Sequence, residues 1–135
     1  MSLTKKLSDK KVNFEFNKEF INVFNKKIKD NDTNFLDRTL KELHPADSAD
    51  IIENLPTENR SKLIELEGFS IDPEIFIELN ESIQTEVFLL LSIDSIVNIL
   101  RRLESDNALK ILENLDEKKK NIVLDKLPPK DRFLL

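Results

Sequence analysis

The chain has 135 residues, enough for one domain with a single core, and it contains no Cys, Trp or Tyr, one His and one Gly. These counts exclude a disulfide framework, a zinc knuckle and a cysteine nucleophile, and one Gly cannot build the glycine-rich loops that bind nucleotide phosphates. The formal net charge is −5, and the abundance of Leu, Lys and Glu together with the near absence of Gly predicts an all-α chain.

The first thirty residues are basic, with eight Lys against four acids. Residues 1–12 are polar, and we expect them to be a flexible N-terminus. Phe16, Phe20 and Phe24 then recur every four residues among lysines, which predicts an amphipathic helix over residues 13–29. A helix of this kind can lie on a membrane or on a partner. We favour a third role, in which it caps the open end of the helical stack that follows.

Residues 33–135 contain a repeat of twelve residues. Leucine occupies seven of the eight positions counted in steps of twelve from Leu43, and Glu67 occupies the other. The residue three positions earlier is apolar in every unit, so each unit contains a short amphipathic helix. A continuous helix would rotate this stripe by about 120° per repeat, so the helix must break once in each unit. We predict a superhelix of short helices, a small α-solenoid, whose handedness the periodicity leaves open.

The unit around Glu67 is irregular. Its repeat position is charged, and we expect Leu66 to take the core position instead. Gly68 comes next and suits the left-handed residue that often follows a helix. The longer connection that leads to Pro73 predicts a kink in the stack.

Acids dominate the middle of the chain, because residues 63–100 hold eight acids and no Lys or Arg. The repeat geometry puts Glu74 and Glu86 in one exposed column and Asp94 and Asp106 in another, at helix starts. We expect these four carboxylates to line an acidic strip, which would attract cations and repel nucleic acid. Capping of helix N-termini is the alternative explanation for Asp94 and Asp106.

Three segments of the repeat carry a resemblance to a known family. They are Leu43-His44-Pro45-Ala46-Asp47 with the following Asp50 to Pro56, then Leu103-x-Ser105-Asp106, and Leu127-Pro128-Pro129-Lys130-Asp131-Arg132. From about residue 35 onward, the chain resembles the N-terminal intracellular domain of MgtE magnesium transporters. The resemblance implies a right-handed superhelix domain over residues 13–135. In this family, a pair of CBS domains and a transmembrane pore follow, and the protein is a dimer. We therefore expect the chain to be the first part of a longer protein.

The resemblance also implies a regulatory role at the cytoplasmic side of the membrane. In this family, carboxylates of the N-terminal domain and of the CBS domains share Mg²⁺ ions, and the bound ions hold the pore closed. Aligned without gaps, the family's interface acids fall on Glu74 and Asp106, while a further acid falls on Lys110, where one ion site is altered or lost. We expect Mg²⁺ ligands at Glu74 and Asp106, and the repeat geometry adds Asp94 and Glu86.

Other classes of function are less consistent with the sequence. An enzyme would need a nucleophile, an activated base or a metal cage, whereas His44 before Pro45 is typical of a turn and helix cap, so we expect no enzyme activity. A nucleic-acid binder would need a basic face, and no segment reaches the roughly 20 apolar residues that cross a bilayer. The remaining alternative is a non-catalytic interaction scaffold, like the related helical units of the flagellar switch protein FliG, which would bind through an apolar groove.

Overall fold

The structure, a computed structural model, describes residues 18–68 and 70–130. Within these ranges the chain forms helices and no strand. The helices are α2 (Lys18–Lys29), α3 (Thr33–Glu42), α4 (Pro45–Glu53), α5 (Thr57–Glu67), α6 (Pro73–Glu78), α7 (Glu81–Leu90), α8 (Ile93–Arg101), α9 (Ser105–Asn114) and α10 (Glu117–Lys126). The all-α prediction is confirmed. Among the described helices, none combines the length and the hydropathy that a membrane span requires.

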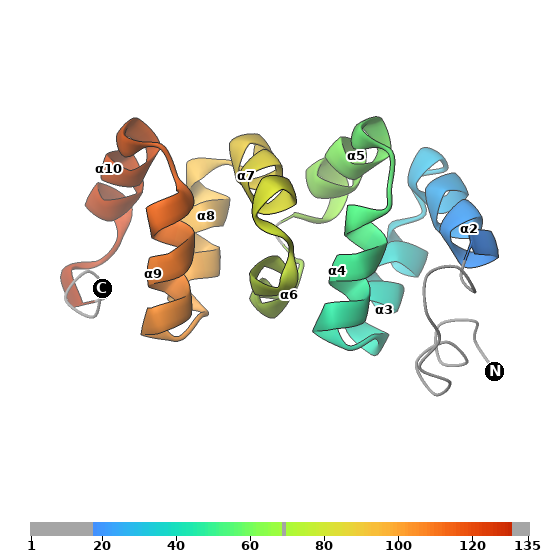
Figure 1. The fold of residues 1–135 in the computed structure, drawn as a ribbon, viewed down its shortest axis with the longest axis horizontal. Helices are drawn as coiled ribbons and strands as arrows, with labels where there is room; N and C mark the ends of the chain where they lie inside the picture. Colours follow the sequence, from blue (N-terminus) through green and yellow to red (C-terminus); the bar gives the residue numbers. More distant parts are fainter. Residues whose placement is uncertain (1–17, 69, 131–135) are drawn as a thin grey trace.

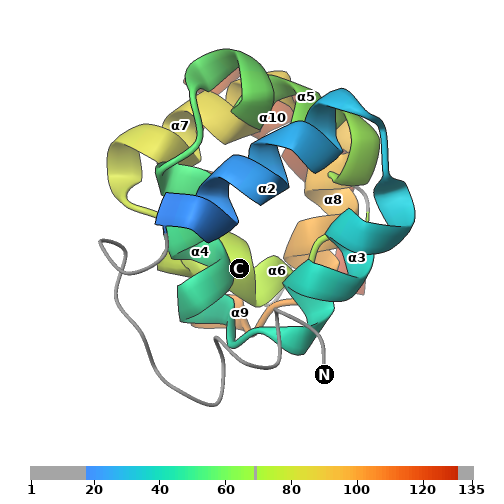
Figure 2. The ribbon, with the colours of Figure 1, turned by 90° about the vertical axis from the view of Figure 1, so that its right-hand side faces the viewer.

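The helices follow one another along the long axis of the molecule, from α2 at one end to α10 at the other (Figure 1). Seen along that axis, they surround it (Figure 2). Much of the packing joins helices that are not consecutive in sequence: α4 packs on α6, α5 on α7, and α8 on α10, while the consecutive helices α2 and α3 also pack on one another. Each short helix is therefore stabilised by its neighbours in the stack, as in a solenoid. The handedness of the superhelix stays a prediction.

The leucine of the repeat ends a helix rather than lying inside one. Five of these leucines are C-caps that follow their helices with an extended backbone and a buried side chain: Leu43, Leu79, Leu91, Leu115 and Leu127. An extended residue stops the helical hydrogen-bond pattern while its side chain still fills the core. The predicted break in each unit is thus confirmed. In these five units the leucine is both a core side chain and the first non-helical residue, whereas Asn54 and Arg102 are the C-caps before Leu55 and Leu103.

Polar side chains start most of the helices. Five N-cap side chains each accept a hydrogen bond from a backbone N–H of the first turn: Asp32, Asp72, Asn80, Ser92 and Asp116. His44 does the same through Nδ1, which lies 3.2 Å from the backbone N of Ala46. A cap of this kind contributes about 1 kcal/mol. His44 is therefore a helix cap, as the sequence indicates.

Helix α2 covers one end of the stack. Its Phe20, Phe24 and Ile28 are buried, and it packs on α3 and α5. The ring of Phe24 lies 6.4 Å from the ring of Phe35 on α3. This packing supports the capping role predicted for residues 13–29. The predicted start of that helix, and the domain boundary at residue 13, lie outside the described residues.

The unit around Glu67 is irregular, but two of the expectations for it are wrong. Glu67 itself takes the core position and is 5% exposed, whereas Leu66 is only half-buried. Gly68 has a φ of −48°, in the right-handed helical region, so it is not the expected left-handed residue. Glycine fits this position because there is no room for a side chain: a Cβ atom there would lie 2.5 Å from the backbone oxygen of Ile64 and 2.9 Å from Leu91 Cδ2.

This close packing generates a prediction for Gly68→Ala. We expect the variant to lose about 1 to 3 kcal/mol of unfolding free energy, because the added methyl group overlaps backbone that cannot move independently. Urea denaturation measures the loss. The control Ser82→Ala, at an exposed position of α7, should stay within about 0.5 kcal/mol of the parent. Equal midpoints for the two variants would contradict the packing argument.

The buried Glu67 generates a second prediction. Burial raises its pKa, the hydrogen bond from Ser70 lowers it, and the charges of Asp37 and Lys41 act in opposite directions, with a raised pKa as the outcome. The folded state thus binds this proton more tightly than the unfolded state, and ionised Glu67 lowers stability. The contribution of this residue to stability should improve as the pH falls through the folded-state pKa.

We expect Glu67→Gln to be more stable than the parent at pH 7, and the difference should disappear below about pH 4, where the carboxyl is protonated in both states. Urea denaturation across this pH range measures the difference. The exposed neighbour Glu65 supplies the control Glu65→Gln, which should show no such trend. A difference for Glu67→Gln that is constant with pH would contradict the assignment.

Candidate functional site

Three of the four predicted metal ligands lie in the first turn of a helix: Glu74 on α6, Asp94 on α8 and Asp106 on α9. Caps fix two of these helix starts. Asp72 Oδ1 accepts the backbone N–H of Glu74 at 3.0 Å, and Ser92 Oγ accepts a backbone N–H of the next helix at 3.1 Å. The helix dipole favours negative charge at each start. The sequence therefore holds these carboxylates on ordered backbone while their side chains face solvent.

The three carboxylates differ in their surroundings. Glu74 and Asp106 are exposed, and no cationic side chain in residues 18–68 or 70–130 forms an ion pair with either. Asp94 is also exposed, but its Oδ1 lies 3.4 Å from Nζ of Lys126 on α10. An exposed pair of this kind contributes at most about 1 kcal/mol. Glu74 and Asp106 are therefore the carboxylates whose charge is least compensated.

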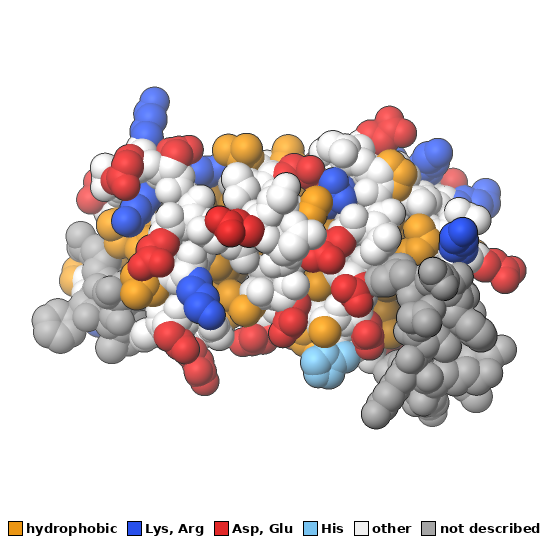
Figure 3. All heavy atoms as spheres, viewed as in Figure 1, with side chains coloured by type: hydrophobic (Ala, Val, Ile, Leu, Met, Phe, Trp, Pro, Cys, Tyr) orange, Lys and Arg blue, Asp and Glu red, His pale blue; other side chains and the backbone are white. Residues whose placement is uncertain are grey.

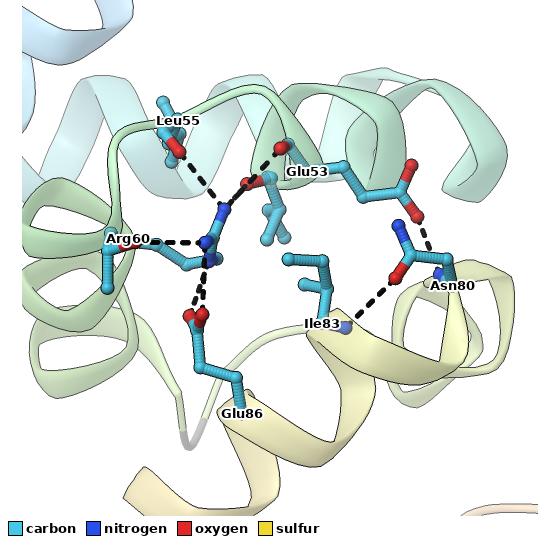
Figure 4. A network of polar contacts seen from close by, with 8 residues as sticks. Glu53, Leu55, Arg60, Asn80, Ile83 and Glu86 are labelled. Atoms are coloured by element: carbon cyan, nitrogen blue, oxygen red, sulfur yellow. Dashed lines mark hydrogen bonds and ion pairs between the residues drawn. The ribbon is translucent and has the colours of Figure 1, made fainter.

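Glu86, the fourth predicted ligand, is bound to a buried arginine. Arg60 on α5 is 5% exposed, and its guanidinium donates to both carboxylate oxygens of Glu86 on α7, with Nη2 3.0 Å from Oε1. The same guanidinium donates through Nη1 to the backbone oxygens of Ile52 at 3.1 Å and Leu55 at 3.0 Å, at the end of α4 (Figure 4). The charge of Glu86 is thus already matched within the fold.

The structure keeps the predicted ligands apart. Helices α8 and α9 are consecutive and joined by a short connection, so Asp94 and Asp106 are separated by the length of α8, roughly 10 Å at 1.5 Å per residue. In the part of the chain that the structure describes, no group of three or more His, Asp or Glu side chains could hold a metal ion. The exposed carboxylates can therefore supply only part of a metal site, which a partner would have to complete.

A second group of acids lies where α4 packs on α6. This acidic face consists of Asp47, Asp50 and Glu53 on α4 and Glu78 on α6. Figure 3 shows acidic side chains gathered over these two helices. Burial raises the pKa of Asp50, and the negative charges of Glu53, Asp47 and Glu78 raise it further. The face is negative because four acids gather on it, and their mutual repulsion makes Asp50 easier to protonate.

The sequence contained a signal for part of this face. Asp47, Asp50 and Glu53 follow one another at steps of three, which places them on one side of a helix. The contribution of Glu78 depends on the packing of α6 against α4, which the spacing does not reveal. One member also has a structural contact, since Glu53 Oε2 accepts the backbone N–H of Asn80, which caps α7 (Figure 4).

Comparison with known proteins gives one match. Residues 43–135, which begin at the first leucine of the repeat, match the family described as the MgtE intracellular N domain. The matched range contains α4 to α10, together with all four predicted metal ligands and the acidic face. The chain has no significant match among curated proteins or among solved structures.

The Arg60–Glu86 pair generates a prediction. We expect Glu86→Gln to lose about 1 to 3 kcal/mol of unfolding free energy, because it leaves the buried guanidinium without its compensating charge. Arg60→Lys should also destabilise the domain, since one ammonium group cannot reach all of the acceptors that the guanidinium binds.

Urea denaturation measures both effects. Glu81→Gln is the matched control, because it removes the same charge from an exposed position of the same helix. The prediction is wrong if Glu86→Gln and Glu81→Gln unfold at the same urea concentration.

Proposed function

We propose that this chain, which belongs to the family of MgtE intracellular N domains, senses intracellular Mg²⁺ for the transporter that contains it. Membership of the family makes it the intracellular domain of a magnesium transporter, with a regulatory and not a catalytic role. The proposal adds that carboxylates of this domain share Mg²⁺ with CBS domains of the same protein or of its dimer mate, and that this sharing closes the pore.

The observation that carries the proposal is that Glu74 and Asp106 are exposed and form no ion pair with a cationic side chain of the described residues. Mg²⁺ prefers oxygen ligands, keeps several of its waters and is often bound by only one or two carboxylates. The donor set of this surface therefore fits Mg²⁺ as one half of a shared site. A single carboxylate with water binds weakly, so the isolated domain should have low affinity, which suits a sensor that responds to the ion only when a second domain is close.

The charge on this domain provides the switch. Without the positive charge that Mg²⁺ supplies, Glu74, Asp106 and the acidic face repel any acidic surface brought against them, because like charges at a few ångströms are costly where solvent is excluded. With that charge present, the carboxylates attract the facing surface. The domain itself need not change shape, since its helices move toward or away from the partner as one packed unit.

Lys110 adjusts the strength of this response. It lies four residues after Asp106 on α9 and is exposed, so its ammonium group is one helical turn from that carboxylate. A positive charge at that distance competes with a cation for Asp106. The Mg²⁺ response through Asp106 should therefore be weaker than the response of the same site without this lysine.

The experiment uses this domain joined to the CBS domains that we expect to follow it in the parent protein. Limited proteolysis is carried out over the millimolar range of Mg²⁺, with Na⁺ at equal ionic strength as the salt control. We expect Mg²⁺ to slow cleavage between the domains, the pair Glu74→Ala and Asp106→Ala to weaken this protection, and Lys110→Gln to strengthen it.

Glu117→Ala is the matched control, because it removes an exposed first-turn acid from α10, outside the predicted ligands. It should keep the full response. If the unmutated protein, this domain joined to the CBS domains, is cleaved equally fast at all Mg²⁺ concentrations, the proposed sensor function is wrong. That result would favour the alternative of a helical interaction scaffold that does not respond to Mg²⁺.

A further inference from the structure

One buried side chain connects the two helices that carry Glu74 and Asp106. Gln84 on α7 is 7% exposed, and its Nε2 donates to the backbone oxygen of Phe76 at 2.8 Å, while its Oε1 accepts from Asn114 Nδ2 at 2.8 Å. Phe76 lies on α6, two residues after Glu74. Asn114 is the last residue of α9, which has Asp106 in its first turn. The amide of Gln84 therefore links the two proposed ion ligands through their helices.

This link crosses a part of the stack where successive helices are packed less closely. Within residues 18–68 and 70–130, α3 packs on α5, α4 on α6 and α5 on α7, and the pattern resumes with α8 on α10. The two steps between them, from α6 to α8 and from α7 to α9, have looser backbone packing. We call this region the seam. It has α6 and α7 on one side and α8 and α9 on the other (Figure 1).

A groove with a volume of about 220 Å³ lies at the seam. Residues from both sides line it: Thr85, Phe88 and Leu89 from α7, and Asn114, Leu115, Asp116 and Lys119 from the end of α9 and the start of α10. Side chains that face unfilled space lose packing contacts. The hydrophobic core is continuous through the seam, but the hydrophobic effect has no preferred direction. Directional contacts are therefore needed to fix the position of α8 to α10 relative to α6 and α7.

Lys119 provides a second link across the seam. In three units, the residue five positions after the repeat position donates to the backbone oxygen eight residues earlier: Ser48, Arg60 and Gln84. The next unit has Ile96 at this position, and its side chain has no donor. The corresponding oxygen belongs to Phe88, and Nζ of Lys119 on α10 donates to it at 2.6 Å. A bond that is elsewhere made within a unit is thus made here between α7 and α10.

We propose that Gln84, Asn114 and Lys119 are positioning residues that fix the spacing between Glu74 and Asp106. Because α8 packs on both α9 and α10, the two links hold the same group of three helices. Hydrogen bonds constrain both distance and angle, which the apolar contacts do not. The proposal rests on the Mg²⁺-sensing function, since a fixed spacing lets both carboxylates meet the ligands of one facing surface at the same time.

Distance measurement between spin labels tests the spacing in the full 135-residue chain without Mg²⁺. The chain contains no Cys, so Glu74→Cys and Asp106→Cys supply the only thiols for labelling. We expect a narrow distribution of label distances. The unlinked variant, Asn114→Ala with Lys119→Met, should make it roughly twofold broader, because only non-directional contacts then cross the seam. The conservative pair Asn114→Gln with Lys119→Arg keeps a donor at each position and should keep the distribution narrow.

Two controls separate a loss of spacing from a general loosening of the fold. Lys118→Met with Asn121→Ala makes the same two replacements at exposed positions of α10 and should leave the distribution unchanged. Labels at Glu58 on α5 and at Glu74 lie on one side of the seam, so the unlinked variant should not broaden their distances. A cross-seam distribution that stays narrow in the unlinked variant, or equal broadening for both label pairs, would overturn the proposal.

The consequence for Mg²⁺ is measured by proteolysis of the domain joined to the CBS domains. The unlinked variant should need about threefold more Mg²⁺, or more, for half of the full protection, because its two carboxylates are no longer preorganised. The conservative pair should restore the parent value. An unlinked variant that keeps the parent value would overturn the positioning role. No protection in the unmutated protein would instead contradict the sensor function, and the label distances would still decide whether these residues fix the spacing.

Discussion

The first half of the helical stack depends on one buried guanidinium. At the end of α4, Ile52 and Leu55 are buried, and the backbone oxygens of a last helical turn lack the full set of intrahelical donors. Arg60 satisfies them from α5, and Glu86 on α7 balances its charge. Arginine suits this role because its planar group carries five donors and stays ionised. A hydrophobic residue at this position would leave buried oxygens unsatisfied, so the three helices are held in one arrangement by polar contacts as well as by core packing.

The same packing places some acids of the chain inside the stack and leaves others at its surface. Inside the stack, Glu86 is engaged by Arg60 and Glu67 is buried beside Ser70. Outside, Glu74, Asp106 and the acidic face form no ion pair with a cationic side chain of the described residues. The repeat geometry alone gives the same weight to Glu86 and Glu74, since both precede a repeat position by the same distance, and only the family resemblance favours Glu74. The difference comes from an arginine 26 residues away, and it makes the two helix-start carboxylates the better candidates for binding a cation.

The composition was enough to predict the all-α fold, the periodic spacing of leucines predicted the break in each unit, and His44 before Pro45 predicted the helix cap. These features depend on residues close together in the chain, where helix geometry relates spacing to position. The errors arose where distant units meet. Gly68 was expected to be left-handed, but a side chain there would meet Leu91 of a distant unit as well as Ile64 of its own helix, and Glu67 is buried where α3 packs on α5. The contact of Glu78 with the acids of α4 has the same origin.

Short stacked helices give this domain two kinds of surface from one repeat. Helix starts carry acids because the dipole favours them, and Asp106 is such an acid. Helix ends meet at buried leucines, and the groove forms where Leu115 ends α9 beside α7. The bond between Asn114 and Gln84 joins α9 to α7 at that end. The start of α9 thus carries an exposed carboxylate, while its end is held in the stack by this bond.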